Sequence, residues 1–349
     1  MVPAKNLITL ISPVYKKKPF LKKLVNSIKK QPYENWELIF IEDCGNDGSL
    51  ELLEKYASTD QRVKIIANET NKGVDASRFE GIKNASGEFV MFIDADDWLA
   101  YDALSKLLAK AIEENCDIVY GAFSKVIDNF GIIKKKGLNS YSPLNQTEMI
   151  RQPVLFDEFY MSYFGVNKLL VSMWGKLYKR SIFADAALKP TGFKMGEDLI
   201  FNMVLHPYLN KVAFIPDVVY YYRWGGMTNN FNPTFLLDIK DQYYLKKKNI
   251  VKYNYQKALP FIKYELANCF YSHFLNQLLL EDISKKNLQL NIMQELEDKI
   301  YGELEHVEYE KAMHLYNREI EAITQEIWRT YKGKKYNYKF KKIINSILR

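Results

Sequence analysis

The sequence predicts a two-part α/β protein, in which a doubly wound domain with a parallel sheet is followed by an all-helical C-terminal domain. Apolar runs alternate with amphipathic stretches over about the first 120 residues, which is the pattern of βα units. After Pro233, glycine and proline become rare and apolar residues recur with a helical period to the end of the chain. We therefore place a domain boundary near residue 230, between residues 1–230 and residues 231–349.

The apolar runs of the first domain are short and continuous, as in strands that are buried on both faces of a parallel sheet. The stretches between them carry apolar residues three or four positions apart, as at Leu21, Leu24 and Ile28, and this spacing predicts helices. In chain order the sequence predicts a strand at Leu7–Val14, a helix at Phe20–Lys30, a strand at Glu37–Ile41, a helix at Leu50–Ala57, a strand at Val63–Ala67, a helix at Val74–Asn84, a strand at Phe89–Ile93, a helix at Leu104–Glu114 and a strand at Asp117–Phe123.

The pattern is weaker in the middle of the chain. Residues 129–153 hold glycines, a proline and a run of three lysines, which indicates loops or edge strands. Val212–Tyr222 is predicted to form one or two strands, interrupted by Pro216 because proline has no N–H for the ladder. Beyond residue 234 we expect about four or five helices of ordinary length.

Composition excludes several classes of protein. A chain of 349 residues can bury a large core without disulfides or a structural metal. Its three cysteines, Cys44, Cys116 and Cys269, lie far apart and form no CxxC pair, so neither a disulfide framework nor a zinc ribbon is expected. No apolar run approaches the ~18 residues of a membrane span, and the N-terminus lacks a signal pattern. We therefore expect a cytoplasmic protein.

The net charge of +7 is concentrated in the last 21 residues. Residues 329–349 hold eight basic and no acidic residues, and without them the chain has 41 basic against 42 acidic residues. Aromatic and aliphatic residues interleave this basic tail, as in an amphipathic helix. Such a helix can lie on an anionic membrane, here the inner face, or pack on its own domain or on a second subunit of a homo-oligomer. Nucleic acid is not an expected partner, because no basic stripe extends into the body of the chain.

Three carboxylates follow the fourth predicted strand. Asp94 and Asp96 lie two positions apart, so they project to the same side where this strand ends. Adjacent carboxylates repel each other, and Mg²⁺ or Mn²⁺, held together with substrate phosphates, offsets that repulsion. The alternative is capping of the next helix by Asp97 or Asp102. Capping accounts for Asp102 and partly for Asp97, but not for Asp94.

Two other strand ends carry polar or aromatic side chains. Asp43 closes the second predicted strand, where a carboxylate can accept an N–H from a nucleobase. Its alternative role is a turn or a helix cap, which Asp47 can supply instead. Tyr15 closes the first strand with a ring that can stack on a base, although a single tyrosine is also a common packed surface residue. Because doubly wound folds bind ligands at the carboxyl ends of their strands, these side chains form one candidate site.

Four motifs in order resemble those of a family 2 glycosyltransferase with the GT-A fold: Ile11–Tyr15, Glu42–Ser49, Asn71–Arg78 and Asp94–Asp97. The resemblance covers about residues 6–125 closely and continues more loosely to about residue 230. It implies an inverting, metal-dependent hexosyl- or N-acetylhexosaminyltransferase of the type that builds bacterial surface glycans. The implied donor is a nucleoside diphosphate sugar, with a UDP-sugar favoured. The implied acceptor is a hydroxyl of a glycan, glycoprotein or lipid-linked saccharide.

The resemblance also implies roles for individual residues. It places four residues around the nucleobase: Pro13, Val14, Tyr15 and Asp43, the last of which accepts the base N–H. Arg78 matches a basic residue near the nucleotide, Asp94 the ribose-side acid, and Asp96 the ligand of the metal that bridges the diphosphate. The chain departs from the usual Gly-Ser after the base-binding aspartate, because Cys44 and Gly45 stand there. This departure leaves Asp43 in place.

Glu197 and Asp198 resemble the ED motif of the family, in which the aspartate is the base. A carboxylate within hydrogen-bond reach of the acceptor hydroxyl can take its proton as the new bond forms. The alternative is an acidic pair that stabilises a helix N-terminus through the macrodipole.

Two further segments resemble the acceptor side of the family. One holds Trp174, which can stack on a sugar or belong to the core, and Lys176. The other ends at Arg223, which can reach the diphosphate, and residues 224–230 after it read as a lid over the donor.

Two other functions compete with this one. A non-catalytic glycan-binding or scaffolding subunit can keep the fold, but it has no need of the acidic motifs that are present here. A nucleotidyltransferase shares the metal and a related sheet, but it carries a glycine-rich loop after the first strand. Tyr15–Pro19 stands at that place without a glycine.

Overall fold

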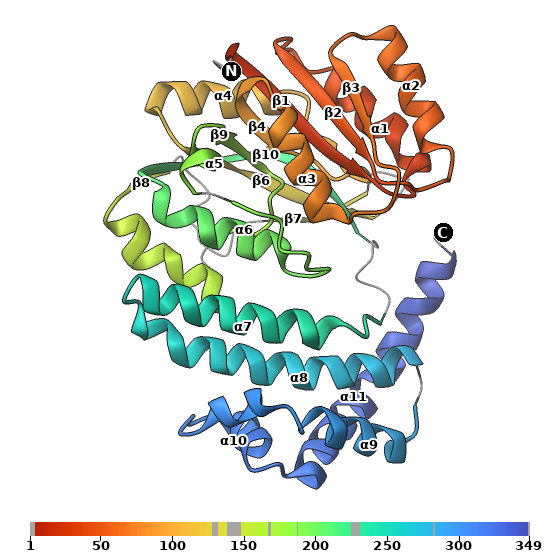
Figure 1. Ribbon diagram of the computed structural model, residues 1–349. Coiled ribbons are helices and arrows are strands. Elements are labelled where there is room, and N and C mark those ends of the chain that lie inside the picture. The colour runs from red at the N-terminus through yellow and green to blue at the C-terminus, as the bar shows by residue number, and fades with distance from the viewer. Residues whose placement is uncertain are drawn as a thin grey trace. The chain divides into compact units, whose positions relative to one another are not determined.

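A computed structural model gives the structure of the chain (Figure 1). It describes residues 4–127, 132–137, 148–166, 169–186, 188–224, 231–281 and 283–347. The chain divides into two compact units, an α/β unit of Met1–Tyr163 and Asn167–Trp224 and a helical unit of Phe164–Val166 and Gly225–Arg349. The predicted boundary at residue 230 falls in segment 225–230, which lies outside the described residues.

The α/β unit is built on one large sheet with the strand order β3-β2-β1-β4-β9-β6-β10-β5, to which β7 is added on β6 and β8 on β10. The strands are β1 (Ala4–Val14), β2 (Trp36–Glu42), β3 (Val63–Ala67), β4 (Gly87–Phe92), β5 (Trp98–Leu99), β6 (Ile118–Ile127), β7 (Ile132–Gly137), β8 (Glu148–Arg151), β9 (Lys176–Lys179) and β10 (Lys211–Trp224). Strands β1 to β4 are parallel, which confirms the prediction for this part of the sheet. The sheet as a whole is mixed, because β9, which the periodicity did not predict, is antiparallel to both β4 and β6.

Helices cover both faces of this sheet. They are α1 (Lys18–Lys29), α2 (Ser49–Thr59), α3 (Val74–Asn84), α4 (Ala103–Glu114), α5 (Ile182–Asp185) and α6 (Glu197–Leu205). Leu10 of β1 shares a buried apolar cluster with α1 and α4, whereas its neighbour Ile11 faces α3. Gly81 lets α3 approach the sheet closely, because a Cβ at this position would collide with Ile11. The alternation of side chains along β1 therefore supports a helix layer on either face.

Strand β10 settles the prediction about Pro216. The segment forms a single strand from Lys211 to Trp224 that pairs in parallel with β6. Its register shifts between Phe214 and Val218, so Pro216 lies inside an irregularity of the ladder. A bulge tolerates a residue that has no N–H to donate, and the strand continues past it.

The helical unit contains five α-helices within residues 231–281 and 283–347, in agreement with the predicted four or five. They are α7 (Phe235–Lys252), α8 (Leu259–Glu281), α9 (Lys285–Glu295), α10 (Glu310–Tyr316) and α11 (Ile320–Ile347). Phe270 of α8 lies at its core, with ring centroids 4.8 Å from Phe274 and 5.3 Å from Tyr301. The basic tail continues α11. Among the described residues, no helix is both long enough and apolar enough to span a bilayer.

Candidate active site

The carboxyl ends of β1, β2 and β4 meet at one edge of the sheet. Tyr15, Asp43 and Asp94 follow these strands directly or within two residues. The register pairs Val14 with Glu42, and the Asp43 N–H donates to the Val14 carbonyl at 2.8 Å. The strand ends that the sequence singled out are therefore neighbours in the structure.

Asp43 holds the loop that leads into α3. Its Oδ1 accepts from Asn68 Nδ2 and from the Lys72 N–H, and its Oδ2 accepts from the Gly73 N–H, each at 2.8 Å. Gly73 has a φ of +87°, a conformation that favours glycine, so the chain turns there and starts α3. A carboxylate has about four acceptor positions, so Asp43 Oδ2 retains capacity for one more donor.

The other residues that we predicted to lie around the nucleobase differ in how far their side chains are exposed. The Tyr15 side chain is 41% exposed at the end of β1, as stacking on a base requires. Pro13 is half-buried, and Val14 is 0% exposed. Val14 therefore acts only through its backbone, whose carbonyl fixes Asp43.

Arg78 of α3 connects three carboxylates from two other segments. Its Nη1 donates to Glu197 Oε1 at 3.0 Å and to Asp198 Oδ1 at 2.5 Å, and its Nη2 donates to Asp94 Oδ1 at 3.0 Å. The Arg78 side chain is only 4% exposed, so these contacts are largely shielded from water. The structure thus brings together four of the residues that the sequence analysis proposed for the site.

Burial and mutual repulsion change the titration of these acids. Burial, with the neighbouring charge of Asp198 added to it, raises the pKa of Glu197 to about 8 although Arg78 acts in the opposite direction. Burial also raises the pKa of Asp94, against the effect of Arg78. Both carboxyl groups therefore keep their protons to a higher pH than an exposed carboxyl group does.

Asp198 lies in the first turn of α6 and is held from two sides. Its Oδ1 accepts from Arg78, and its Oδ2 accepts from the Met173 N–H at 3.1 Å. The side chain is 21% exposed, so the carboxylate is fixed but reachable. Such a group is able to accept a proton from a bound hydroxyl.

Asp96 lies among cationic side chains that the sequence analysis did not assign to it. Lys17, which follows β1, donates from Nζ to Asp96 Oδ2 in a short contact. Arg223 Nε donates to the Asp96 carbonyl at 2.9 Å, and its guanidinium lies 4.7 Å from the centroid of the Phe20 ring. Lys17 was missed although a run of three lysines directly after β1 was a visible signal.

Asp97 and Asp102 have other roles than the predicted helix caps. Asp97 is buried, and it accepts from the Tyr220 hydroxyl at 2.8 Å and from the Arg223 N–H at 2.7 Å. It therefore connects the acidic loop to β10. Asp102 precedes α4 but makes no side-chain cap, and its carboxylate pairs with Lys106 instead.

One prediction about the acceptor side, that for Lys176, needs correction, and the packing of Trp174 favours one of its two alternatives. The Lys176 side chain is 0% exposed because β9 lies inside the sheet, so its ammonium does not reach acceptor or diphosphate. The Trp174 ring stacks on Tyr220 and Tyr222, with centroids 4.8 and 5.3 Å apart. It belongs to an aromatic cluster, which is the core interpretation. The predicted lid falls mostly on residues 225–230, outside the described part of the chain.

The acidic residues suit a divalent cation that also binds a substrate. In the part of the chain that the structure describes, no three carboxylate, imidazole or thiol side chains are placed to hold a metal ion by themselves. Mg²⁺ and Mn²⁺ sites that bind phosphates need only one or two carboxylates. Asp96 already contacts an ammonium group, and burial together with Asp94 and Asp96 raises the pKa of Asp97 well above its usual range. The donor set fits such an ion.

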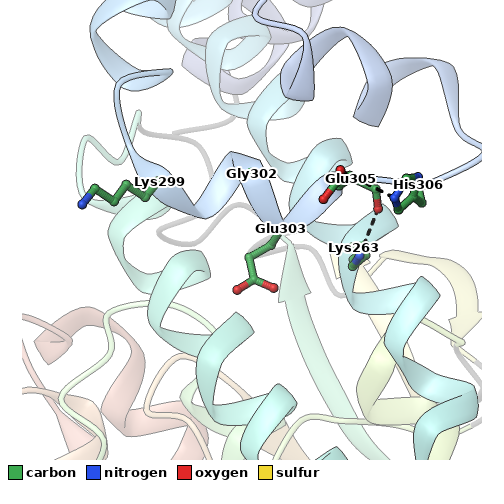
Figure 2. Close-up of a pocket in the computed structure, with 6 residues that line it drawn as sticks. All are labelled: Lys263, Lys299, Gly302, Glu303, Glu305 and His306. Carbon is green, nitrogen blue, oxygen red and sulfur yellow. Dashed lines mark hydrogen bonds and ion pairs between the residues drawn. The ribbon is translucent and has the colours of Figure 1, made fainter.

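The helical unit has a hollow of its own, of about 330 Å³ (Figure 2). It is lined by Lys263, Lys299, Gly302, Glu303, Glu305 and His306. Lys263 Nζ donates to the Glu305 carbonyl at 3.3 Å, and the His306 ring lies 3.5 Å from the Glu305 carboxylate. Glu303 pairs instead with Lys247, and the lining includes none of the acids discussed above, so the strand-end site remains the candidate.

Comparison with known proteins adds sequence and fold relatives. The family model for Glycosyl transferase family 2 matches residues 9–185. Glycosyltransferase GlyA of Streptococcus pneumoniae is 32% identical over 219 residues, which are 62% of this chain and 30% of that protein. The uncharacterized glycosyltransferase EpsJ of Bacillus subtilis is 25% identical over 300 residues, 85% of this chain and 83% of that protein. The chain thus spans less than a third of GlyA but most of EpsJ.

A similar structure is that of Staphylococcus aureus TarS 1-349 in complex with UDP-GlcNAc. It has a TM-score of 0.59 and 19% sequence identity, and the match covers 95% of this chain and 91% of that one. At this identity the likeness concerns the fold alone. It extends over both units of the chain.

Proposed function

Because the chain belongs to glycosyl transferase family 2 and has the GT-A fold, we propose that it is an inverting, metal-dependent transferase of a hexose or N-acetylhexosamine. The proposed donor is a UDP-sugar, which the complexes of TarS with UDP and with UDP-GlcNAc support. TarS of S. aureus is named a poly(ribitol-phosphate) beta-N-acetylglucosaminyltransferase and is 27% identical over 220 residues. This name supports a hydroxyl acceptor on a glycan, glycoprotein or lipid-linked saccharide of the bacterial surface.

The observation that carries the proposal is the contact of Arg78 with Asp94, Glu197 and Asp198. These residues lie on separate segments, and only the fold brings them together. Asp43 Oδ2 and the exposed Tyr15 ring lie along the same edge, where they suit the N–H and the face of a uracil base. The site therefore offers recognition of the nucleotide beside a cluster of acids.

In the proposed reaction, Asp198 accepts the proton of the acceptor hydroxyl. At the same time the oxygen of that hydroxyl bonds to the anomeric carbon of the donor sugar, and the bond between this carbon and the diphosphate breaks. One displacement of this kind inverts the anomeric centre. The Met173 N–H and Arg78 hold the Asp198 carboxylate in place. Asp96 would hold Mn²⁺ or Mg²⁺, which when bound supplies positive charge to the departing diphosphate, and Asp94 would face the ribose.

The test is a panel of UDP- and TDP-sugars with Mn²⁺ or Mg²⁺, in which diphosphate release is measured with and without a chelator. We expect one donor to be turned over and the chelator to abolish its turnover. Binding of UDP in the presence of Mn²⁺ is measured in parallel by calorimetry. No turnover of any donor together with no binding of UDP would overturn the proposal. Glycan binding without turnover would favour the non-catalytic subunit instead.

A further inference from the structure

The α/β unit contains a lysine that the proposed reaction does not use. Lys176 of β9 is 0% exposed, and its Nζ donates to Asn202 Oδ1 at 3.2 Å. The same Nζ lies 4.8 Å from the Tyr120 ring centroid and 5.9 Å from that of Tyr178. The ammonium is thus surrounded by an amide and two aromatic faces.

Asn202 links this lysine to the backbone of the proposed base. It stands one turn after Asp198 on α6, and its Nδ2 donates to the Asp198 carbonyl at 2.8 Å and to the Val171 carbonyl at 2.9 Å. Its Oδ1 accepts from Lys176 and also from the Tyr178 hydroxyl, at 3.0 Å. The orientation of the Asn202 amide is therefore fully determined by its partners.

A second path leads from the same cluster to the Asp198 side chain. The Tyr178 hydroxyl has a single proton, which it can donate to the Met173 carbonyl at 3.3 Å in place of Asn202 Oδ1. Met173 in turn donates from its N–H to Asp198 Oδ2. The cluster thus contacts Asp198 through its carbonyl on one side and through its carboxylate on the other.

A contribution to stability does not explain why an ammonium group is buried at this position. In the described part of the chain, no carboxylate lies close enough to form an ion pair with Lys176, so its desolvation is only partly compensated, by the more distant charge of Asp198. Burial lowers the pKa of Lys176 to about 7, although the charge of Asp198 acts in the opposite direction. An apolar residue of the same length would avoid this penalty. The titratable groups around Lys176 are Asp198 on α6, Tyr120 on β6, Tyr178 on β9 and His206, whose pKa burial lowers to about 4.

We infer that Lys176 and Asn202 are positioning residues that hold Asp198 in the orientation needed to accept the proton of the acceptor. The inference rests on the proposed function. Neither residue contacts a substrate, and both act through α6 and Met173. The presence of a costly buried ammonium is thereby explained as stability given up for the placement of a catalytic carboxylate.

Lys176→Met tests this, because methionine keeps an unbranched side chain and removes the charge. The control is Lys179→Met on the same strand, whose ammonium bonds with Asn115 at the surface. We expect Lys176→Met to melt at the parental temperature or above it, and to bind UDP within twofold of the parent. We expect kcat to fall at least tenfold and KM for the donor to stay unchanged.

A readout that needs no turnover separates this inference from the proposed function. The Met173 N–H donates to Asp198, so its hydrogen exchange, measured by mass spectrometry with residue-resolved fragmentation, reports the position of that carboxylate. Exchange should be at least tenfold faster in Lys176→Met than in the parent or in Lys179→Met. If Lys176→Met does not fold, Tyr178→Phe removes one donor to Asn202 and should have the same effects, but smaller.

Parental kcat together with unchanged Met173 exchange in Lys176→Met would overturn the inference. A melting temperature that falls together with unchanged kcat would show a merely structural role. Lack of turnover in the parent itself would count against the proposed function. In that case the hydrogen exchange of the Met173 N–H would be the measurement that decides the positioning role.

Discussion

The guanidinium of Arg78 donates a hydrogen bond to the carboxylate of Asp198, although the two residues are 120 positions apart in the chain. Arg78 lies on α3, which packs against β1 and β2, and Asp198 lies in the first turn of α6. Arg78 bonds with Asp94 and Glu197 as well, so one buried cation holds three acids from two segments. It is the electrostatic centre of the candidate site.

Removal of the Arg78 guanidinium should lower both the free energy of unfolding and the rate of transfer. Arg78→Met leaves three partly buried carboxylates without their partner, and loss of one member of a buried ion pair costs about 3 kcal/mol. The loss should be larger at pH 8 than at pH 5, because the pKa of Asp94 and of Glu197 is already raised and protonation relieves the repulsion at low pH. Urea unfolding at both pH values measures it.

The control for this variant is Lys83→Met. Lys83 is 71% exposed and pairs with Glu80 at the surface, where an ion pair contributes little. We expect a change below about 1 kcal/mol for the control. Equal stability of Arg78→Met and the parent at pH 8 would contradict the role assigned to Arg78.

Glu197→Gln should alter the pH dependence of stability. In the native protein the pKa of Glu197 is about 8, whereas its ordinary value is 4.5, so the native state binds more protons than the unfolded state between these values. The parental free energy of unfolding therefore falls as pH rises through this window, and the glutamine variant lacks that fall. Relative to the parent, the variant should gain about 1–3 kcal/mol from pH 5 to pH 8.

Unfolding in urea at the two pH values checks this gain. Glu113→Gln is the matched control, because Glu113 is 68% exposed and pairs with Lys110 on the surface. A difference between Glu197→Gln and the parent that is the same at pH 5 and pH 8 would show that the carboxyl titrates normally.

Two single substitutions should separate donor binding from transfer. Asp96→Asn weakens the proposed metal site, so we expect Mn²⁺-dependent binding of UDP to fall at least tenfold and turnover to be lost. Asp198→Asn removes the base, so we expect transfer to fall 10²–10⁴-fold while UDP binding stays within twofold of the parent. Calorimetric titration with UDP and the electron paramagnetic resonance signal of free Mn²⁺ measure the binding of nucleotide and metal without catalysis. Parental transfer by Asp198→Asn would rule out this residue as the base.

The basic tail has two alternative partners, an anionic membrane and a protein surface, and charge removal should distinguish them. Replacement of Lys332, Lys334 and Lys335 by glutamine removes three charges, each worth about 1 kcal/mol near such a surface. Sedimentation with vesicles that contain phosphatidylglycerol should show binding at least tenfold weaker. The control carries the same change at three lysines elsewhere in the helical unit, Lys248, Lys257 and Lys286. A shifted oligomeric state with unchanged vesicle binding would favour a subunit contact, and no change in either would favour a solvated helix.

Much of the fold follows from local patterns in the sequence. Val63–Ala67 and Val74–Asn84 form β3 and α3 with the predicted bounds, because apolar periodicity and Gly73 specify them locally. The strand-end positions of Asp43 and Asp94 follow from the same pattern, since parallel strands place their carboxyl ends at one edge. Strand β9 was not predicted, because its four residues are too few for a period to be visible.

The sequence by itself therefore determined the strands β1 to β4, the helices α1 to α4 and which acids stand at the strand ends, because these depend on neighbours along the chain. The tertiary structure decided what each charge faces. That Arg78 holds three acids, that Asp97 is bonded to β10 and that Lys176 is buried beside Asn202 depends on contacts between distant segments. Such contacts set burial and pairing, which leave no periodic signal in the order of residues.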